Sequence, residues 1–189
     1  MNKMTCAFTG HRPSRFPWAY DETDQRCIAL KEILTGEIMR LADIGVTNFL
    51  SGMAEGVDTW ASVIVLALRE KNPLIKLHCI LPCKTQADDW SSASQTLYRS
   101  ILEQADSIVY VSRNHHSNCM MERNRFMVDH ASILVAIYQE TPRSGTAATI
   151  HYARKMGREI IIVAPLSHTL THEGAASEQS EVSTERNVL

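Results

Sequence analysis

Hydrophobic positions along the chain follow two different spacings. Short apolar runs, such as SILVAI at residues 132–137 and EIIIV at 159–163, are typical of strands that are buried on both sides. Between such runs apolar residues recur every three or four positions, the spacing of one helix face, as at Cys27, Leu30, Leu34, Ile38 and Leu41. The pattern predicts strands at residues 3–10, 46–50, 74–81, 106–111, 131–138 and 159–164, and helices at 24–43, 55–71, 89–105, 119–130 and 144–156.

The regular change between the two spacings determines the expected fold class. It predicts an α/β fold, in which a doubly wound, mainly parallel sheet has helices on both faces. We expect one domain over residues 1–165. From residue 166 to 189 the apolar periodicity stops and Ser, Thr, Glu and His prevail, so we expect a disordered or loosely attached tail.

The unusual residues gather in loops that follow the predicted strands. TGHRP follows the first strand, SGMAEGVD the second and PRSGTAA the fifth. In an open parallel sheet these loops share one edge, where ligands bind. Glycine lets the backbone approach a ligand, and a helix that starts after such a loop offers free N–H groups to phosphate. The residues expected to bind an anionic ligand are Gly10, His11, Arg12, Ser51, Gly52, Glu55, Gly56, Asp58, Asn124, Arg143, Ser144, Gly145 and Thr146.

A purely structural interpretation of the same loops stays open. Ser, Thr and Gly are common helix starts and need bind nothing. Neither loop matches the dinucleotide fingerprint or the P-loop spacing. Arg12 is the strongest single candidate, because an arginine directly after a buried strand indicates an anionic partner.

Three carboxylates, Glu55, Asp58 and Asp129, are the candidates for acid/base chemistry or for hydrogen bonds to a ribose. Glu55 and Asp58 lie in the first turn of a predicted helix, where acidic residues are also favoured electrostatically. Most polar side chains of residues 122–129 are expected to be solvated, while Asn124 and Asp129 are expected to reach the ligand cleft.

The aromatic residues of the first loop have two interpretations. Phe16, Trp18 and Tyr20 can stack on a nucleobase, or they can form an apolar flap over the core.

Composition narrows the classes of function. A net charge of −2 gives no basic footprint for nucleic acid. No apolar run is long enough to cross a membrane, and the N-terminus has no secretory signal, so we expect a cytoplasmic protein without a membrane partner. The five cysteines are scattered. Cys79 and Cys83 are four residues apart, but no second pair of ligands follows at zinc-site spacing, and adjacent residues such as His115 and His116 rarely face one ligand together, so we expect no metal site.

Three segments together are similar to a known family. TGHRP, SGMAEGVDTWA and the stretch from NRFMVDHASILVAIY to SGTAATIHYA resemble the YpsA-like, domain-of-unknown-function 1273 family over residues 3–164. That family belongs to the superfamily that unites DprA/Smf with the LOG phosphoribohydrolases. The resemblance implies a Rossmann-like fold that binds a nucleotide or related phosphorylated ligand; it implies no certain cofactor.

The resemblance also shows where this chain departs from the LOG enzymes. Their loop P-G-G-x-G-T-x-x-E is matched here by residues 142–149, with Gly145 and Thr146 retained. The double glycine is replaced by Arg143 and Ser144, and the catalytic glutamate by Thr149. A non-catalytic binder is therefore favoured over an N-glycosidic hydrolase.

These observations leave several classes of function. The first is a regulatory protein that binds or senses a nucleoside phosphate, ADP-ribose or a similar ligand. Such a protein can form a homo-oligomer or bind another protein as its partner. The second is a nucleotide-processing enzyme, such as a phosphoribohydrolase. The third is a DprA-like single-stranded DNA-binding module, which the net charge disfavours. A pure interaction or cell-division adaptor role is also compatible with the resemblance.

Overall fold

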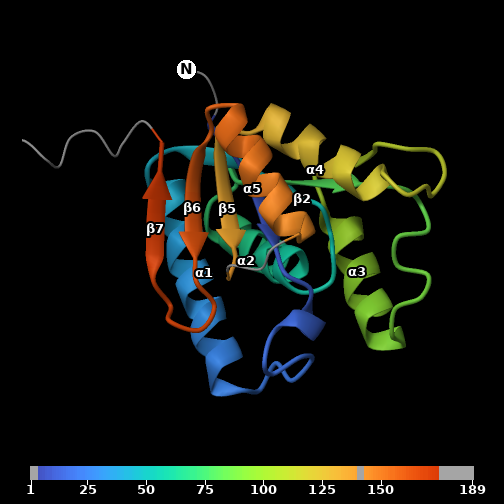
Figure 1. The fold of residues 1–189 in the computed structure, drawn as a ribbon, viewed down its shortest axis with the longest axis horizontal. Coiled ribbons are helices and arrows are strands. Elements are labelled where there is room, and N and C mark those ends of the chain that lie inside the picture. The colour runs from blue at the N-terminus through green and yellow to red at the C-terminus, as the bar shows by residue number, and fades with distance from the viewer. Residues whose placement is uncertain (1–3, 140–142, 175–189) are drawn as a thin grey trace, which may run out of the picture.

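A computed structural model describes residues 4–139 and 143–174, which form a seven-stranded sheet with helices on both faces (Figure 1). The strand order is β4-β3-β2-β1-β5-β6-β7, and neighbours are parallel except for the antiparallel pair β6–β7. The predicted α/β, Rossmann-like class is therefore confirmed. The strands are β1 (Met4–Gly10), β2 (Val46–Ser51), β3 (Lys76–Leu81), β4 (Ser107–Tyr110), β5 (Ile133–Ile137), β6 (Glu159–Val163) and β7 (Leu170–Glu173).

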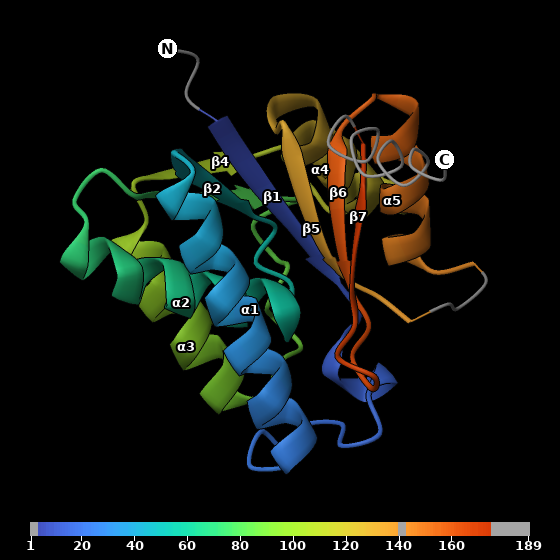
Figure 2. The same ribbon diagram turned by 90° about the vertical axis from the view of Figure 1, so that its left-hand side faces the viewer.

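The helices form two layers, one on each side of the sheet (Figure 2). Helices α1 (Gln25–Asp43), α2 (Val57–Lys71) and α3 (Ser92–Gln104) cover one face. Helices α4 (Cys119–His130) and α5 (Gly145–Lys155) cover the other. A short 3-10 helix, η1 (Pro13–Arg15), follows β1.

Each strand contributes side chains to both layers, because successive residues of a strand point to opposite faces. Phe8 and Phe49 belong to the apolar cluster under α1, α2 and α3. Their neighbours Ala7 and Leu50 belong to the cluster under α4 and α5. Burial on both sides explains why the strand sequences are almost continuously apolar.

The order of the strands reverses beside β1. The chain places β2, β3 and β4 on one side of β1, and then crosses to place β5 and β6 on the other. The carboxyl ends of β1 and β5 therefore flank the topological switch point, where open α/β sheets bind their ligands.

Most predicted boundaries hold, and the differences have local causes. Helix α2 begins at Val57, two residues later than predicted, because Gly56 has φ 95° and acts as its N-cap. Helix α3 begins at Ser92, because the Ser91 hydroxyl caps it by accepting from the Ser94 N–H at 3.1 Å.

Strand β7 was not predicted from the sequence. Residues 170–173 lie in the segment expected to be a loosely attached tail, yet they pair with β6 along Ile160–Val163. Arg154 of α5 fixes this strand through a bidentate ion pair with Glu173, at 2.7 and 2.8 Å. The segment is polar because β7 is an edge strand with three exposed residues, so it has no apolar run. Residues 175–189 lie outside the described residues.

Each helix in residues 4–139 and 143–174 is too short or too polar to cross a membrane. Within the same ranges, His, Cys, Asp and Glu side chains form no group of three that can hold a metal ion.

Candidate functional site

A cavity of about 290 Å³ opens at the carboxyl ends of β1 and β5, the switch point of the sheet. Four segments that are distant in sequence form its walls. They are residues 9–12 and 15 after β1, residues 54 and 58 around the start of α2, residues 120, 123 and 124 of α4, and residues 143–146 at the start of α5.

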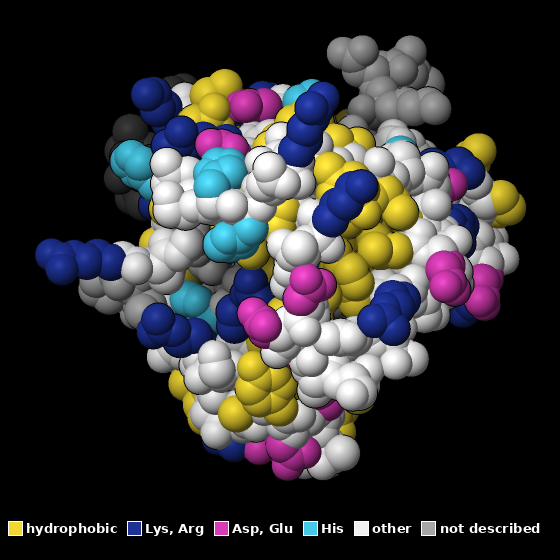
Figure 3. Space-filling view, turned by 90° about the vertical axis from the view of Figure 1, so that its right-hand side faces the viewer, with side chains coloured by type: hydrophobic (Ala, Val, Ile, Leu, Met, Phe, Trp, Pro, Cys, Tyr) yellow, Lys and Arg dark blue, Asp and Glu magenta, His cyan; other side chains and the backbone are white. Residues whose placement is uncertain are grey.

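Positive charge prevails in this cavity. The described residues that line it include four arginines, Arg12, Arg15, Arg123 and Arg143, against one acidic residue, Asp58. The chain as a whole has a net charge of −2, so the positive charge is local. Figure 3 shows Lys, Arg and His side chains gathered around a hollow on one side of the molecule. Such a concave, positively charged surface attracts anions.

The first turn of α5 supplies uncharged donors to the same cavity. The Ser144 hydroxyl accepts from the Ala147 N–H at 3.0 Å, which satisfies one of the free donors of the helix start. The N–H groups of Gly145 and Thr146 have no acceptor among the described residues. Together with the helix dipole, they offer an anion two further hydrogen bonds.

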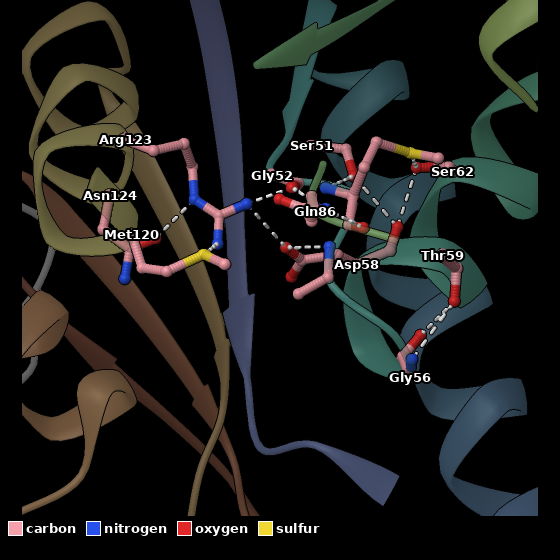
Figure 4. A network of polar contacts seen from close by, with 12 residues as sticks. Ser51, Gly52, Gly56, Asp58, Thr59, Ser62, Gln86, Met120, Arg123 and Asn124 are labelled. Atoms are coloured by element: carbon pink, nitrogen blue, oxygen red, sulfur yellow. Dashed lines mark hydrogen bonds and ion pairs between the residues drawn. The ribbon is translucent and has the colours of Figure 1, made fainter. Parts of the chain in front are cut away.

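Arg123 differs most from the sequence-based expectation, which placed it in solvent. It is only 4% exposed and crosses from α4 to the loop after β2 (Figure 4). Its Nη1 donates to the Gly52 carbonyl and lies 3.8 Å from the Asp58 carboxylate, and its Nε donates to Asn124 Oδ1 at 2.8 Å. The described residues offer Nη2 only the thioether sulfur of Met120, at 3.9 Å. Arg123 therefore keeps hydrogen-bonding capacity on the cavity side.

The glycines of the loop after β2 serve the protein's own side chains. A Cβ on Gly52 would lie 2.8 Å from Arg123 Nε and closer still to Cζ and Nη1. A Cβ on Gly56 would lie 2.8 Å from Pro13 Cδ, and the φ of 95° also favours glycine. The Ser51 hydroxyl donates to the Asp58 carbonyl at 3.0 Å. The lining of the cavity does not include Ser51, Gly52 or Gly56, which the sequence predicts to bind the ligand.

The candidate carboxylates are distributed over three places. Asp58 reaches the cavity, and its Oδ2 accepts from the Ala54 N–H at 3.1 Å. Burial raises the pKa of the Asp58 carboxyl, and the nearby Arg123 partly offsets that rise. Glu55 does not line the cavity and lies 3.5 Å from the Tyr20 hydroxyl. Asp129 lies near the amino ends of β1 and β5, at the opposite edge of the sheet, so the expectation that it reaches the cleft was wrong.

Thr149, which the resemblance to the LOG enzymes aligns with their glutamate, is buried and joins two helices. Its hydroxyl donates to the Gly145 carbonyl at 2.8 Å and accepts from Asn124 Nδ2 at 2.9 Å. Since Asn124 also accepts from Arg123, the chain of bonds runs from Arg123 to the first turn of α5. These bonds hold the two cationic walls of the cavity at a fixed separation.

The loop after β1 contributes residues with different roles. Gly10 lines the cavity and allows close packing, because a Cβ there would lie 2.5 Å from Val57 Cγ2. His11 is buried and its Nε2 donates to the Gln139 carbonyl at 3.2 Å, which ties this loop to the end of β5. Burial lowers the pKa of the His11 ring, so it is neutral at pH 7. Arg12 lies with its guanidinium 6.0 Å from the Trp90 ring centroid.

The aromatic residues that follow form an apolar flap over the core. Phe16 stacks on Trp18 with ring centroids 4.9 Å apart, and it also packs against Trp60. Phe16 and Trp18 are each 5% exposed, so they are not free to stack on a base. Tyr20 is exposed.

Nine of the thirteen predicted binding residues therefore share one cavity: Gly10, His11, Arg12, Asp58, Asn124, Arg143, Ser144, Gly145 and Thr146. Sequence reasoning missed five other lining residues, which are Thr9, Arg15, Ala54, Met120 and Arg123. Arg123 had a detectable signature, because it stands four residues from both Cys119 and Met127, which form the buried stripe of α4.

Comparisons with known proteins agree with this architecture. A UPF0398 protein of Halalkalibacterium halodurans is 27% identical over 128 residues, 67% of this chain and 68% of the relative. The uncharacterized SPbeta prophage-derived protein YoqJ of Bacillus subtilis is 32% identical over 120 residues, 57% of this chain and 70% of the relative.

A solved structure of DNA processing protein A from Helicobacter pylori, which concerns its single-stranded DNA binding mode, is similar with a TM-score of 0.57. The sequence identity is 16%, so this likeness shows the fold alone. It covers 86% of this chain, and this chain spans 66% of that protein.

The family model described as the YspA SLOG family matches residues 6–164. This range includes β1 from Cys6 onward, all of β2 to β6 and every described residue that lines the cavity. The resemblance to the YpsA-like family is thus confirmed, and the chain belongs to the YspA SLOG family.

Proposed function

We propose that this protein binds a nucleotide or a related phosphorylated small molecule, such as a nucleoside phosphate or ADP-ribose, in the cavity beside β1 and β5, and that it acts as a sensor or regulator. The single observation that carries the proposal is the set of donors around the cavity. Four arginines from three different segments converge with the free N–H groups of α5 on a hollow with one acidic residue among its described lining. Phosphate is the biological anion that such donors fit best.

The distribution of carboxylates supports binding without hydrolysis. Residue 149 is a buried threonine engaged with Asn124 and Gly145, and Glu55 and Asp129 lie away from the cavity. An acid or base must lie within hydrogen-bond reach of the proton that it transfers. Of the three candidates, Asp58 alone lines the cavity.

A thermal-shift panel of nucleoside mono-, di- and triphosphates and ADP-ribose tests the proposal. A ligand present at 100 times its Kd adds about 2.7 kcal/mol to the free energy of unfolding. For a chain of this size that corresponds to a rise in Tm of about 5–10 °C. Arg12→Ala and Gly145→Asp should each abolish the rise, because the first removes a donor and the second places a carboxylate among the donors.

Arg125→Ala is the matched control. Arg125 stands on α4 two residues from Arg123, but it is exposed and lies over the Tyr152 ring, outside the cavity. It should leave the ligand-induced rise in Tm unchanged. A panel in which no member raises the Tm of the wild-type protein, or a rise that survives both cavity substitutions, would refute the proposed site.

A nucleotide-processing enzyme is the second candidate function. The observation that favours it is the position of the Asp58 carboxyl in the cavity. Its raised pKa is what a general acid in a cavity needs. Incubation with nucleoside monophosphates, followed by mass spectrometry for free base, separates the two functions. If the wild-type protein releases free base and Asp58→Asn abolishes this release, the protein is an enzyme. If a nucleotide binds but no base is released, the function as a sensor is favoured.

A further inference from the structure

A second group of polar side chains lies on three neighbouring strands, outside the arginine cavity. Asn48 of β2, His78 of β3 and Ser107 of β4 are joined in a row. The distances are 2.7 Å from Ser107 Oγ to His78 Nδ1 and 3.0 Å from His78 Nε2 to Asn48 Oδ1. They line a surface groove of about 250 Å³ on the sheet face that carries α4, which shares no residue with the arginine cavity.

The direction of each hydrogen bond in the row follows from its partners. Asn48 Nδ2 donates to Thr47 Oγ1 at 3.2 Å, so the amide oxygen of Asn48 faces His78. An amide oxygen only accepts, and therefore His78 Nε2 carries the hydrogen. In the neutral ring, Nδ1 then has the lone pair and accepts from the Ser107 hydroxyl. The row thus orients a histidine base toward a serine hydroxyl.

The surroundings keep His78 neutral. Burial lowers the pKa of its ring, and the neighbouring Lys76 acts in the same direction, whereas Asp106 acts against it. His130 of α4 also lines the groove, and its Nδ1 is engaged by the Phe126 carbonyl at 2.7 Å. A neutral imidazole within hydrogen-bond reach of a hydroxyl, held by a third side chain, is the arrangement that activates serine nucleophiles.

We propose that Ser107 is a nucleophile for small acyl esters or thioesters, with His78 as its base and Asn48 as the positioning residue. The groove suits an acyl group, because Leu50, Ile80 and Phe126 add apolar walls beside the polar row. The volume of about 250 Å³ is sufficient for a short acyl group, and the groove is open to solvent.

The reaction needs only the acyl donor and water. Ser107 Oγ forms a bond to the carbonyl carbon while its proton passes to His78 Nδ1. Collapse of the tetrahedral adduct breaks the bond to the alcohol or thiol, which leaves with that proton. Ser107 then carries an acyl ester. Water releases the acid by the same two steps, in which His78 again takes and returns the proton.

The test incubates the full chain with p-nitrophenyl acetate. The rate of reaction is measured from the release of nitrophenol, and peptide mapping identifies the acetylated serine. We expect acetylation at Ser107, which Ser107→Ala abolishes. His78→Gln should slow it by at least about 100-fold, the usual contribution of a general base. Ser100→Ala is the matched control, because Ser100 is an exposed serine on α3 outside the groove, and its loss should change nothing.

A second variant distinguishes activation of Ser107 by His78 from a purely structural role of the three hydrogen-bonded residues. This test remains valid even if His78→Gln fails to fold. Asn48→Asp keeps the acceptor oxygen but adds a negative charge, so it should raise the pKa of His78 and move the acid limb of the pH–rate profile upward. A structural row would not move that profile. Acetylation of Ser107 no faster than that of Ser100, or an unchanged pH–rate profile in Asn48→Asp, would overturn the proposal.

Discussion

Gly52→Ala tests whether the glycine after β2 serves Arg123 or a ligand. The added methyl group would lie 2.8 Å from Arg123 Nε and closer to two other guanidinium atoms, so the guanidinium must leave. It cannot shift and keep its partners, because Gly52 carbonyl and Asp58 both lie beside the same nitrogen.

The expected cost follows from the contacts that are lost. A hydrogen bond from a charged donor to a carbonyl contributes about 1.5–3 kcal/mol. Separation of a buried ion pair costs about 3–5 kcal/mol, and protonation of Asp58, whose pKa is already raised, limits that cost. Because the two losses share one guanidinium, they do not add fully. We expect the free energy of unfolding to fall by about 3–5 kcal/mol, with a Tm lower by about 6–20 °C.

The assay is urea unfolding of the ligand-free protein, followed by circular dichroism. Gly145→Ala is the matched control, because a Cβ at this position would meet nothing within 4 Å. Alanine also has a higher helix propensity than glycine. It should leave stability unchanged or raise it by up to about 1 kcal/mol. In a protein that already carries Arg123→Ala, Gly52→Ala should lower the free energy of unfolding by only a few tenths of a kcal/mol, roughly, because the added methyl group no longer meets a guanidinium. Equal stability of Gly52→Ala and the wild type would refute this account of the loop.

Three further predictions concern stability. Thr149→Val should lower the free energy of unfolding by about 1–3 kcal/mol in urea titrations, because Asn124 Nδ2 loses its acceptor; an unchanged midpoint would contradict the helix link. Phe16→Ala should cost about 3–5 kcal/mol, since Phe16 is buried in the aromatic flap, and a cost below 1 kcal/mol, roughly, would mean that the flap is loose. Burial holds the pKa values of His11 and His78 below their ordinary 6.5, so the unfolded chain binds more protons and stability should fall as pH drops below 6.5. His78→Gln should weaken that pH dependence in urea titrations at several pH values; a dependence of unchanged size would exclude His78 as a source.

Local patterns in the sequence were sufficient to predict the fold class and most element boundaries. Continuous apolar strands and helix-spaced stripes are local patterns, and each one needs only its own segment to be recognised. The same logic predicted that residues after β1 and β5 come together, as they do in the cavity lining, because the carboxyl ends of parallel strands share one edge. It did not find β7, whose pairing depends on β6 and on Arg154 rather than on its own polar residues.

Which loop residues line the cavity depends on contacts between segments that are distant in the sequence. Gly52, Gly56 and Ser51 have the composition of a ligand loop, but Arg123 and Pro13 occupy the space beside the two glycines. Arg123 is 71 residues from Gly52 in the sequence, and a buried arginine is tolerated only where distant partners satisfy it. No local sequence pattern predicts the hydrogen bond between Arg123 and Gly52, because it forms only when α4 and the loop after β2 come together in the folded protein.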